Sequence, residues 1–247
     1  MKPHPRTNSF VHRATVMALL LVLALLLPLA AFAAKVTFLE PPVQIKRKGA
    51  ADWVTLRIGQ EVGEGDAIRT GMGARIEVTI APKRVFRIGQ ATELELPAFE
   101  NARGIRAEFS LLGGRFWGSI RTPLRAALKE KFEVKTATAT IGIKGTQFGV
   151  DFDKDRQTSQ VSVIDGQVAA IVPKPAGPPA EVSGPREIAP PEEVSREQWL
   201  LVVSRNQKVI IRPGEEPKVV PMTDADKQDD WVVFNQERDR AQDAGQP

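Results

Sequence analysis

The stretch GIKGTQFGV, residues 142–150, combines glycines, a lysine and a threonine as phosphate-binding loops do. A loop of the GxxxxGK(S/T) type places its lysine after the second glycine and continues into a helix whose N-terminus faces the phosphates. Here Lys144 precedes Gly145, and the following residues, 146–152, alternate as in a strand. Order and context argue against nucleotide chemistry, and the glycines are interpreted as points where the backbone bends or approaches a neighbouring strand.

Carboxylates offer the second kind of chemistry. Glu93 with Glu95, and Asp151 with Asp153 and Asp155, recur at a spacing of two residues, so each set shares one face of a strand. Such pairs are compatible with glycoside hydrolysis or a weak calcium site. The ordinary interpretation is a solvated edge protected by charge.

The residue types that are missing limit the chemistry further. Both histidines, His4 and His12, lie near the start of the chain, and cysteine is absent. The chain downstream of them therefore cannot form Ser-His-Asp or Cys-His nucleophiles, zinc sites of nitrogen and sulfur ligands, haem sites or iron–sulfur clusters. We therefore predict a protein that is not an enzyme and has no cofactor and no metal.

The first 33 residues predict an export signal. Lys2, Arg6 and Arg13 precede an apolar run at 14–30, and Ala31-Phe32-Ala33 forms an A-x-A cleavage site. Cleavage between Ala33 and Ala34 predicts a periplasmic or secreted protein of 247 − 33 = 214 residues. The alternative is a retained leader that anchors the domain in the inner membrane as a signal relay.

Charge is distributed unevenly along the remaining chain. Removing the leader lowers the net charge from +4 to +1, which gives no reason to expect nucleic acid as a partner. Residues 34–172 hold 21 Lys and Arg against 16 Asp and Glu, net +5, whereas residues 173–247 hold 10 against 14, net −4. Either the acidic tail folds back on the basic body, or it is a more solvated segment.

The elements that position these residues are strands. Apolar and polar residues alternate in several segments between glycine-containing turns; these segments are 74–80, 92–96, 105–112, 146–152, 159–164 and 167–172. The pattern predicts an all-β domain over 34–172, as an antiparallel sandwich or a short twisted solenoid-like stack. Asp165-Gly166 predicts a two-residue hairpin turn.

The C-terminal part changes character. Residues 173–191 are rich in proline and glycine and predict a linker. In the extension 192–247, we expect a helix at 192–203, a short strand at 208–213 and a terminal helix that begins after an N-cap at Thr223. Trp231 and Phe234 of that helix are expected to dock on the β domain.

The order of motifs resembles the FecR-type domain over residues 36–172. The resemblance rests on a tryptophan, a GDxIRTG turn, a late GTxF element and a D/G turn; here these residues are Trp53, Gly65, Asp66, Ile68, Arg69, Thr70, Gly71, Gly145, Thr146, Phe148, Asp165 and Gly166. Lys144 stands where the family more often has arginine, and residues 81–84 replace its usual D-G turn. The resemblance implies a non-catalytic envelope module involved in signalling. Because only about a dozen residues precede the apolar run, the sigma-factor control of some members is not carried over.

Two sets of residues are candidates for recognition. Asp66 with Arg69 could form a polar contact point, although an Asp in a glycine-rich turn usually braces that turn. Trp53 and Trp117 could stack on a sugar or a partner peptide, or serve as core anchors. Alternation places Arg115 and Trp117 on one face, so these two are the candidate interaction residues if that face is open.

The preferred hypothesis is an exported scaffold that binds another envelope protein. The alternatives are a module that binds cell-wall glycan, or the membrane-anchored relay with an uncleaved leader, the only case that involves a membrane.

Overall fold

The computed structural model describes residues 34–81, 83–100, 105–121, 130–174 and 198–244. The predicted signal peptide 1–33 and nearly all of the predicted linker lie outside these residues. None of the described helices is long and apolar enough to cross a bilayer.

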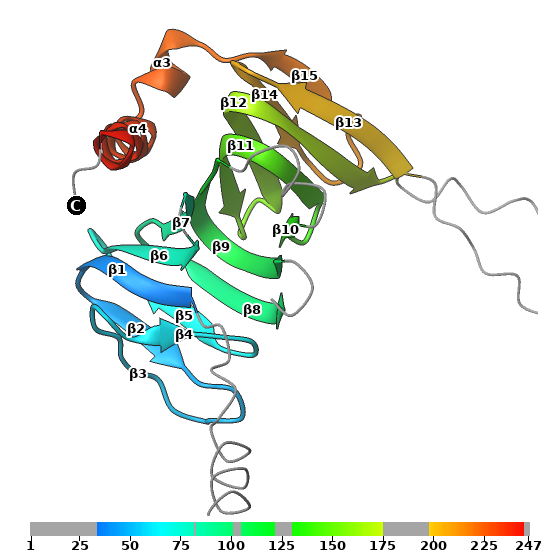
Figure 1. Cartoon of the computed structure of the whole chain (residues 1–247). Helices are drawn as coiled ribbons and strands as arrows, with labels where there is room; N and C mark the ends of the chain where they lie inside the picture. The colour runs from blue at the N-terminus through cyan, green and yellow to red at the C-terminus, as the bar shows by residue number, and fades with distance from the viewer. Residues whose placement is uncertain (1–33, 82, 101–104, 122–129, 175–197, 245–247) are drawn as a thin grey trace, which may run out of the picture. The chain divides into compact units, whose positions relative to one another are not determined.

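The described chain is built from strands, with two helices near its C-terminus (Figure 1). The strands are β1 (Ala34–Glu40), β2 (Val43–Lys46), β3 (Val54–Thr55), β4 (Glu61–Val62), β5 (Ala67–Thr70), β6 (Arg75–Ala81), β7 (Arg84–Ile88), β8 (Glu93–Glu100), β9 (Arg106–Ile120), β10 (Lys131–Lys135), β11 (Thr140–Asp153), β12 (Thr158–Pro173), β13 (Gln198–Ser204), β14 (Gln207–Ile211) and β15 (Lys218–Pro221). The helices are α3 (Asp224–Lys227) and α4 (Asp230–Asp243). The all-β prediction is confirmed.

The described strands form one continuous sheet. Its main path runs β15-β14-β12-β11-β10-β9-β7-β6-β1-β4, while β13 pairs with β12, and β2, β3, β5 and β8 branch from β9. All of the pairs are antiparallel except β9 with β10, so the sheet is mixed rather than purely antiparallel. Parallel neighbours require a crossover connection, and the chain makes it between Ile120 and Lys131.

One face of the sheet encloses the main hydrophobic core. Phe86 lies at its centre, 4.6 Å from Phe109 and 5.6 Å from both Phe116 and Phe132 between ring centroids. Phe148 packs so closely against β9 that a Cβ at position 118 would lie 2.3 Å from its ring, which explains the glycine there. Alternation along each strand sends the remaining side chains to the opposite face.

The predicted hairpin turn at Asp165-Gly166 is wrong, because β12 runs through it from Thr158 to Pro173. The pair instead faces an irregularity in β11, where the register shifts between Lys144 and Gln147. Gly145 and Gly166 both have positive φ, and a Cβ on Gly166 would lie 2.7 Å from the Gly145 carbonyl oxygen. These two glycines therefore let a β-bulge form in the middle of two long strands.

The C-terminal extension is partly as expected. The helix predicted at 192–203 is wrong over its described part, because residues 198–204 form β13 on the edge of β12. The apolar run WLLVV fits a strand as well as a helix, and tertiary pairing decides between them. The strand near 208–213 is confirmed as β14, and Thr223 does cap a helix, the short α3, in a capping box with Asp226.

Candidate functional site

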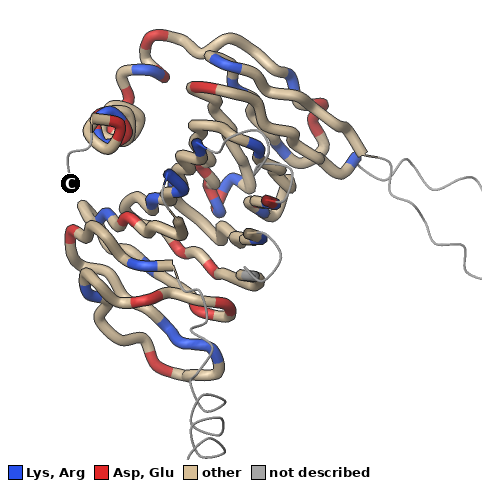
Figure 2. The backbone as a smooth tube through the Cα atoms, viewed as in Figure 1, with Lys and Arg blue, Asp and Glu red and all other residues tan. Residues whose placement is uncertain are grey.

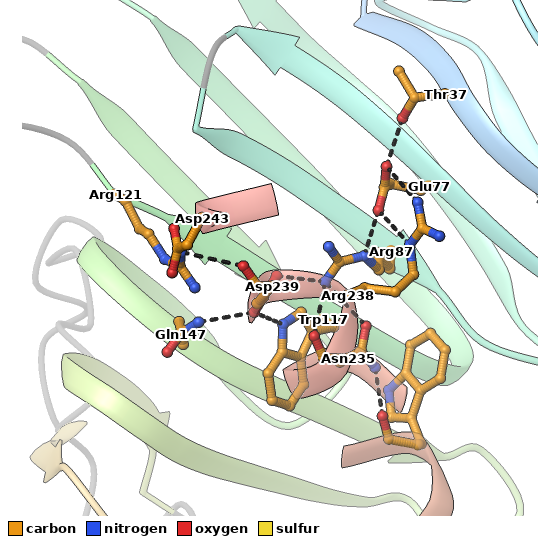
Figure 3. Close-up of polar contacts among 11 residues, drawn as sticks. Thr37, Glu77, Arg87, Trp117, Arg121, Gln147, Asn235, Arg238, Asp239 and Asp243 are labelled. Atoms are coloured by element: carbon orange, nitrogen blue, oxygen red, sulfur yellow. Dashed lines mark hydrogen bonds and ion pairs between the residues drawn. The ribbon is translucent and has the colours of Figure 1, made fainter. Parts of the chain in front are cut away.

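A row of side chains crosses the face of the sheet that is turned away from the main core. Strand pairing places Phe38, Glu77, Arg87, Trp117 and Gly149 directly opposite one another on β1, β6, β7, β9 and β11. Directly paired residues point to the same side of a sheet. Helix α4 lies over this row and covers it (Figure 3).

Asp239 of α4 joins three strands through one carboxylate. Its Oδ1 accepts a hydrogen bond from Arg87 Nη1 (2.7 Å), and its Oδ2 accepts from Trp117 Nε1 (3.2 Å) and Gln147 Nε2 (2.9 Å). Asp239 and Arg87 are each only 1% exposed. A buried carboxylate that is matched by three donors fixes both the position and the rotation of the helix.

A second buried ion pair extends this contact towards β1. Glu77, which is 2% exposed, accepts from Arg87 Nε (2.7 Å), Arg238 Nε of α4 (3.0 Å) and the Thr37 hydroxyl (2.8 Å). Burial alone would raise the pKa of Glu77, but the hydrogen bond from Arg238, together with the charge and hydrogen bond of Arg87, lowers it below its ordinary value. Glu77 is therefore ionised when α4 is docked.

The N-terminus of α4 is held by a third ion pair. Asp229 is the N-cap of α4 and accepts from the backbone N–H groups of residues 231 and 232. The same carboxylate accepts from Arg115 Nη2 (2.8 Å), while Arg115 also pairs with Asp151 (3.0 Å). Burial, together with the nearby charge of Asp229, raises the pKa of Asp151, although Arg115 opposes the shift.

The charges explain why the tail lies on the domain. Arg87 and Arg115 of the strands, and Arg121 directly after β9, bind Asp239, Asp229 and Asp243 of the C-terminal segment. Figure 2 shows both basic and acidic positions on α4 and on the neighbouring strands. Of the two possibilities that the uneven charge left open, the structure thus shows the tail folded back on the basic body.

Apolar contacts in this interface are few. Trp117, Trp231 and Val232 form a small buried cluster, separate from the main core, with Ile164 and Phe234 at its border. The Phe234 ring lies 6.0 Å from Phe38, between ring centroids, which confirms that Trp231 and Phe234 dock on the domain. Two buried donors, Arg87 Nη2 and Trp231 Nε1, have no hydrogen-bond partner within the described chain. The interface is therefore more polar than a domain core, and incompletely satisfied.

The candidate interaction residues lie together in this site. Arg115 and Trp117 do share one face, as alternation predicts, but that face is covered: Trp117 is 0% exposed and its contacts are with the chain's own helix. No sequence pattern singles out Arg87, Glu77 or Asp239. Alternation along residues 74–80 predicts that Glu77 points away from the core-facing Ile76 and Val78, and the structure agrees. The helix that covers Glu77, however, comes from a region more than 150 residues away in the sequence.

The GDAIRTG turn has a structural role in the first strands. Asp66 accepts hydrogen bonds from Gly63 N (3.0 Å), Lys48 N (3.2 Å) and Arg47 Nη1 (2.8 Å), so it braces its own turn. Four other motif residues support the local backbone or the core: Gly65 has a positive φ, Ile68 lies in the core, Thr70 bonds to the Gly89 carbonyl and Gly71 packs against Pro42. Arg69 lies at the surface, over the half-buried Trp53.

The GTQF element reaches the site directly. The Thr146 hydroxyl donates to the carbonyl oxygens of Lys144 (2.9 Å) and Gln167 (2.8 Å) and so secures the bulge at Gly145. The bulge sends Phe148 into the main core and Gln147 towards Asp239. The phosphate-like stretch therefore positions a side chain that holds α4.

The carboxylates with a spacing of two residues do not gather into a metal site in the described residues, where no group of three or more acidic side chains could hold an ion. Glu93 and Glu95 are exposed, and Asp153 accepts from the backbone N–H groups of residues 155 and 156 in the β11–β12 turn.

Fold and site together define an all-β domain that binds a helix on its polar face. Residues 66–169 match the family described as FecR protein, so this part of the chain is similar to that family. Trp53 and Gly65 of the motif set lie just before the matched residues.

Among solved structures, two crystal structures of a candidate anti-sigma factor from Parabacteroides distasonis are similar to this chain. Each has 16% sequence identity, with TM-scores of 0.45 and 0.46, and 64% of this chain is aligned with 61% of that one. The chain thus spans about three fifths of the length of that protein. A search of curated proteins found no match.

Proposed function

We propose that this protein is a non-catalytic binding module of the bacterial cell envelope, exported by its leader, that takes part in signalling by binding another envelope protein. The similarity of residues 66–169 to the FecR family supports the signalling role. The observation that carries the proposal is the polar face of the sheet, whose arginines already bind a helix with acidic side chains at Asp229, Asp239 and Asp243.

The nature of this interface favours exchange. Helix α4 is held by ion pairs and hydrogen bonds and by a small apolar cluster, a composition typical of interfaces that form and dissociate. A partner segment that presents carboxylates at the spacing of Asp229 and Asp239 would meet the same arginines. Helix α4 is then the occupant of the site when no partner is bound.

Crosslinking in envelope fractions tests this proposal. The tagged full-length protein should capture one dominant protein, with crosslinks on β7, β9 and β11. Added to Asp239→Asn, in which α4 is already weakened, the charge reversal Arg121→Glu should reduce the yield several-fold, because Arg121 contributes to the basic face at a position that is partly exposed. Asp239→Asn should increase the yield, since it weakens the competing helix.

Arg156→Glu is the matched control, because Arg156 is an exposed arginine in the β11–β12 turn, away from α4. Equal loss of capture in both charge reversals would contradict the assignment of the site. Enrichment of wall glycan without any protein would instead favour a carbohydrate-binding module. Trp117 is not open for stacking in such a module while α4 is docked.

A further inference from the structure

Within the part of the chain that the structure describes, strand β13 is an edge that lacks the usual protection. In the described chain it pairs along one side only, with β12. Its sequence, QWLLVVS, contains no charged residue and no proline over seven positions. Natural edge strands are kept short or carry lysine, proline or a bulge, because unpaired backbone groups otherwise recruit another strand.

The other terminal strands of the sheet do have these features. Strand β15 carries Lys218 and Pro221 within four residues. Strands β3 and β4 are two residues long, and β4 contains Glu61. The contrast indicates that β13 is paired in the functional protein rather than left open to water.

The side chains of β13 also leave apolar surface exposed. Leu200 is 70% exposed and Val202 is 55% exposed, whereas Val203, on the opposite face, is fully buried. Val202 lies opposite Ala169, which lies opposite Gly142. Because these two residues are small, the outer face is hollowed here, with a volume of about 420 Å³ that Val202 borders.

We infer that β13 pairs with β13 of a second copy of this chain, antiparallel and about a two-fold axis at Leu201. In this register Leu200 lies opposite the second copy's Val202, and Trp199 opposite its Val203. Every central pair is apolar against apolar, on both faces, and no like charges meet. The second copy's Leu200 stands beside Val202, at the border of the hollow.

Self-complementarity is the reason to choose a second copy over another protein. A two-fold contact requires that one surface match itself, and a strand with an apolar centre and no charges satisfies this condition. A seven-residue edge buries less than the roughly 1,200–2,000 Å² of a stable interface, so the dimer is weak and depends on concentration. The contact between the two copies does not involve α4 or the arginines that bind it.

Sedimentation of the processed chain over a range of concentrations is the first measurement. We expect a dimer at high concentration, and we expect Val202→Lys to raise its dissociation constant at least tenfold, because two lysines would enter the pairing. Val54→Lys is the control, since Val54 is a similarly exposed valine, 52% exposed, on β3. A dimer that Val202→Lys leaves unchanged, or a chain that remains monomeric throughout, would overturn the inference.

The register is tested by disulfide trapping, which is clean because the chain contains no cysteine. Leu200→Cys and Val202→Cys are made as separate proteins and oxidised singly or as a mixture. Opposed strand residues have Cα atoms close enough for a disulfide, about 4.4–6.8 Å apart. The mixture should crosslink strongly and each protein alone only weakly; equal yields in all three samples would reject the pairing about Leu201.

Discussion

At the scale of single residues, Arg87 is the group on which the docking of α4 depends most. It bridges Glu77 on β6 and Asp239 on α4 while almost completely buried. Replacing a buried pair by apolar groups can be harmless, but removing one partner leaves an unmatched charge and costs about 3–5 kcal/mol. Arg87→Leu removes the cation and leaves Asp239 with only its neutral donors, Trp117 and Gln147.

We therefore expect Arg87→Leu to release α4 from the sheet. Limited proteolysis should then cut within 230–243, and Trp231 fluorescence should shift towards that of an exposed indole. Arg212→Leu removes an exposed arginine paired with Glu215 and should cost no more than about 0.5 kcal/mol. Equal protease resistance of wild type and Arg87→Leu would show that the buried pair does not hold the helix.

At the scale of elements, α4 should be bound less tightly in acid. The pKa of Glu77 is lowered from its ordinary value of 4.5 when Arg238 of α4 is in place. A lowered pKa stabilises the docked state fully above the ordinary value, and this stabilisation is lost as pH falls through the docked-state pKa. The pKa of Asp151 is raised, so its contribution has the opposite sign and declines as pH rises above its ordinary value of 3.8.

Tryptophan fluorescence between pH 7 and pH 3 measures this release. Glu77→Gln should flatten the acid transition, whereas Asp151→Asn, which removes the opposing contribution, should make it steeper. An identical transition in Glu77→Gln and wild type would assign the pH dependence to other groups.

The elements also differ in how well local sequence patterns predict them. Alternation identified the strands and the face of Glu77, Arg115 and Trp117, since side-chain direction is local. It could not tell that this face is covered, because coverage depends on a distant helix. The bulge at Asp165-Gly166 was missed for a similar reason: the dipeptide suits a hairpin and a bulge equally, and pairing with Gly145 decides.

Charge was the one sequence feature that predicted a contact between distant parts of the chain. The excess of basic residues in 34–172 and of acidic residues in 173–247 predicted a tail folded on the body as one of two outcomes. It could not name the pairs, because net charge fixes attraction but not geometry.

At the scale of the whole molecule, the described chain contains two hydrophobic clusters of very different size. The larger one runs through the sheet, whereas the smaller one contains only Trp117, Trp231 and Val232 with two bordering residues. Local stability follows the amount of buried apolar contact, and weakly packed elements open without global unfolding. Helix α4 should therefore open as a unit before the sheet does.

Native-state hydrogen exchange distinguishes the opening of α4 from the opening of the sheet. Amides of α4 should exchange with an opening free energy at least about 2 kcal/mol below that of the central strands β9 and β11. Gly118→Ala, which forces a Cβ against Phe148, should lower protection in β9 and β11, because it acts on the larger cluster. Asp239→Asn should lower protection in α4 alone. If the helix and the central strands share one opening free energy, α4 is an integral part of the folding unit, and a partner could not displace it without unfolding the domain.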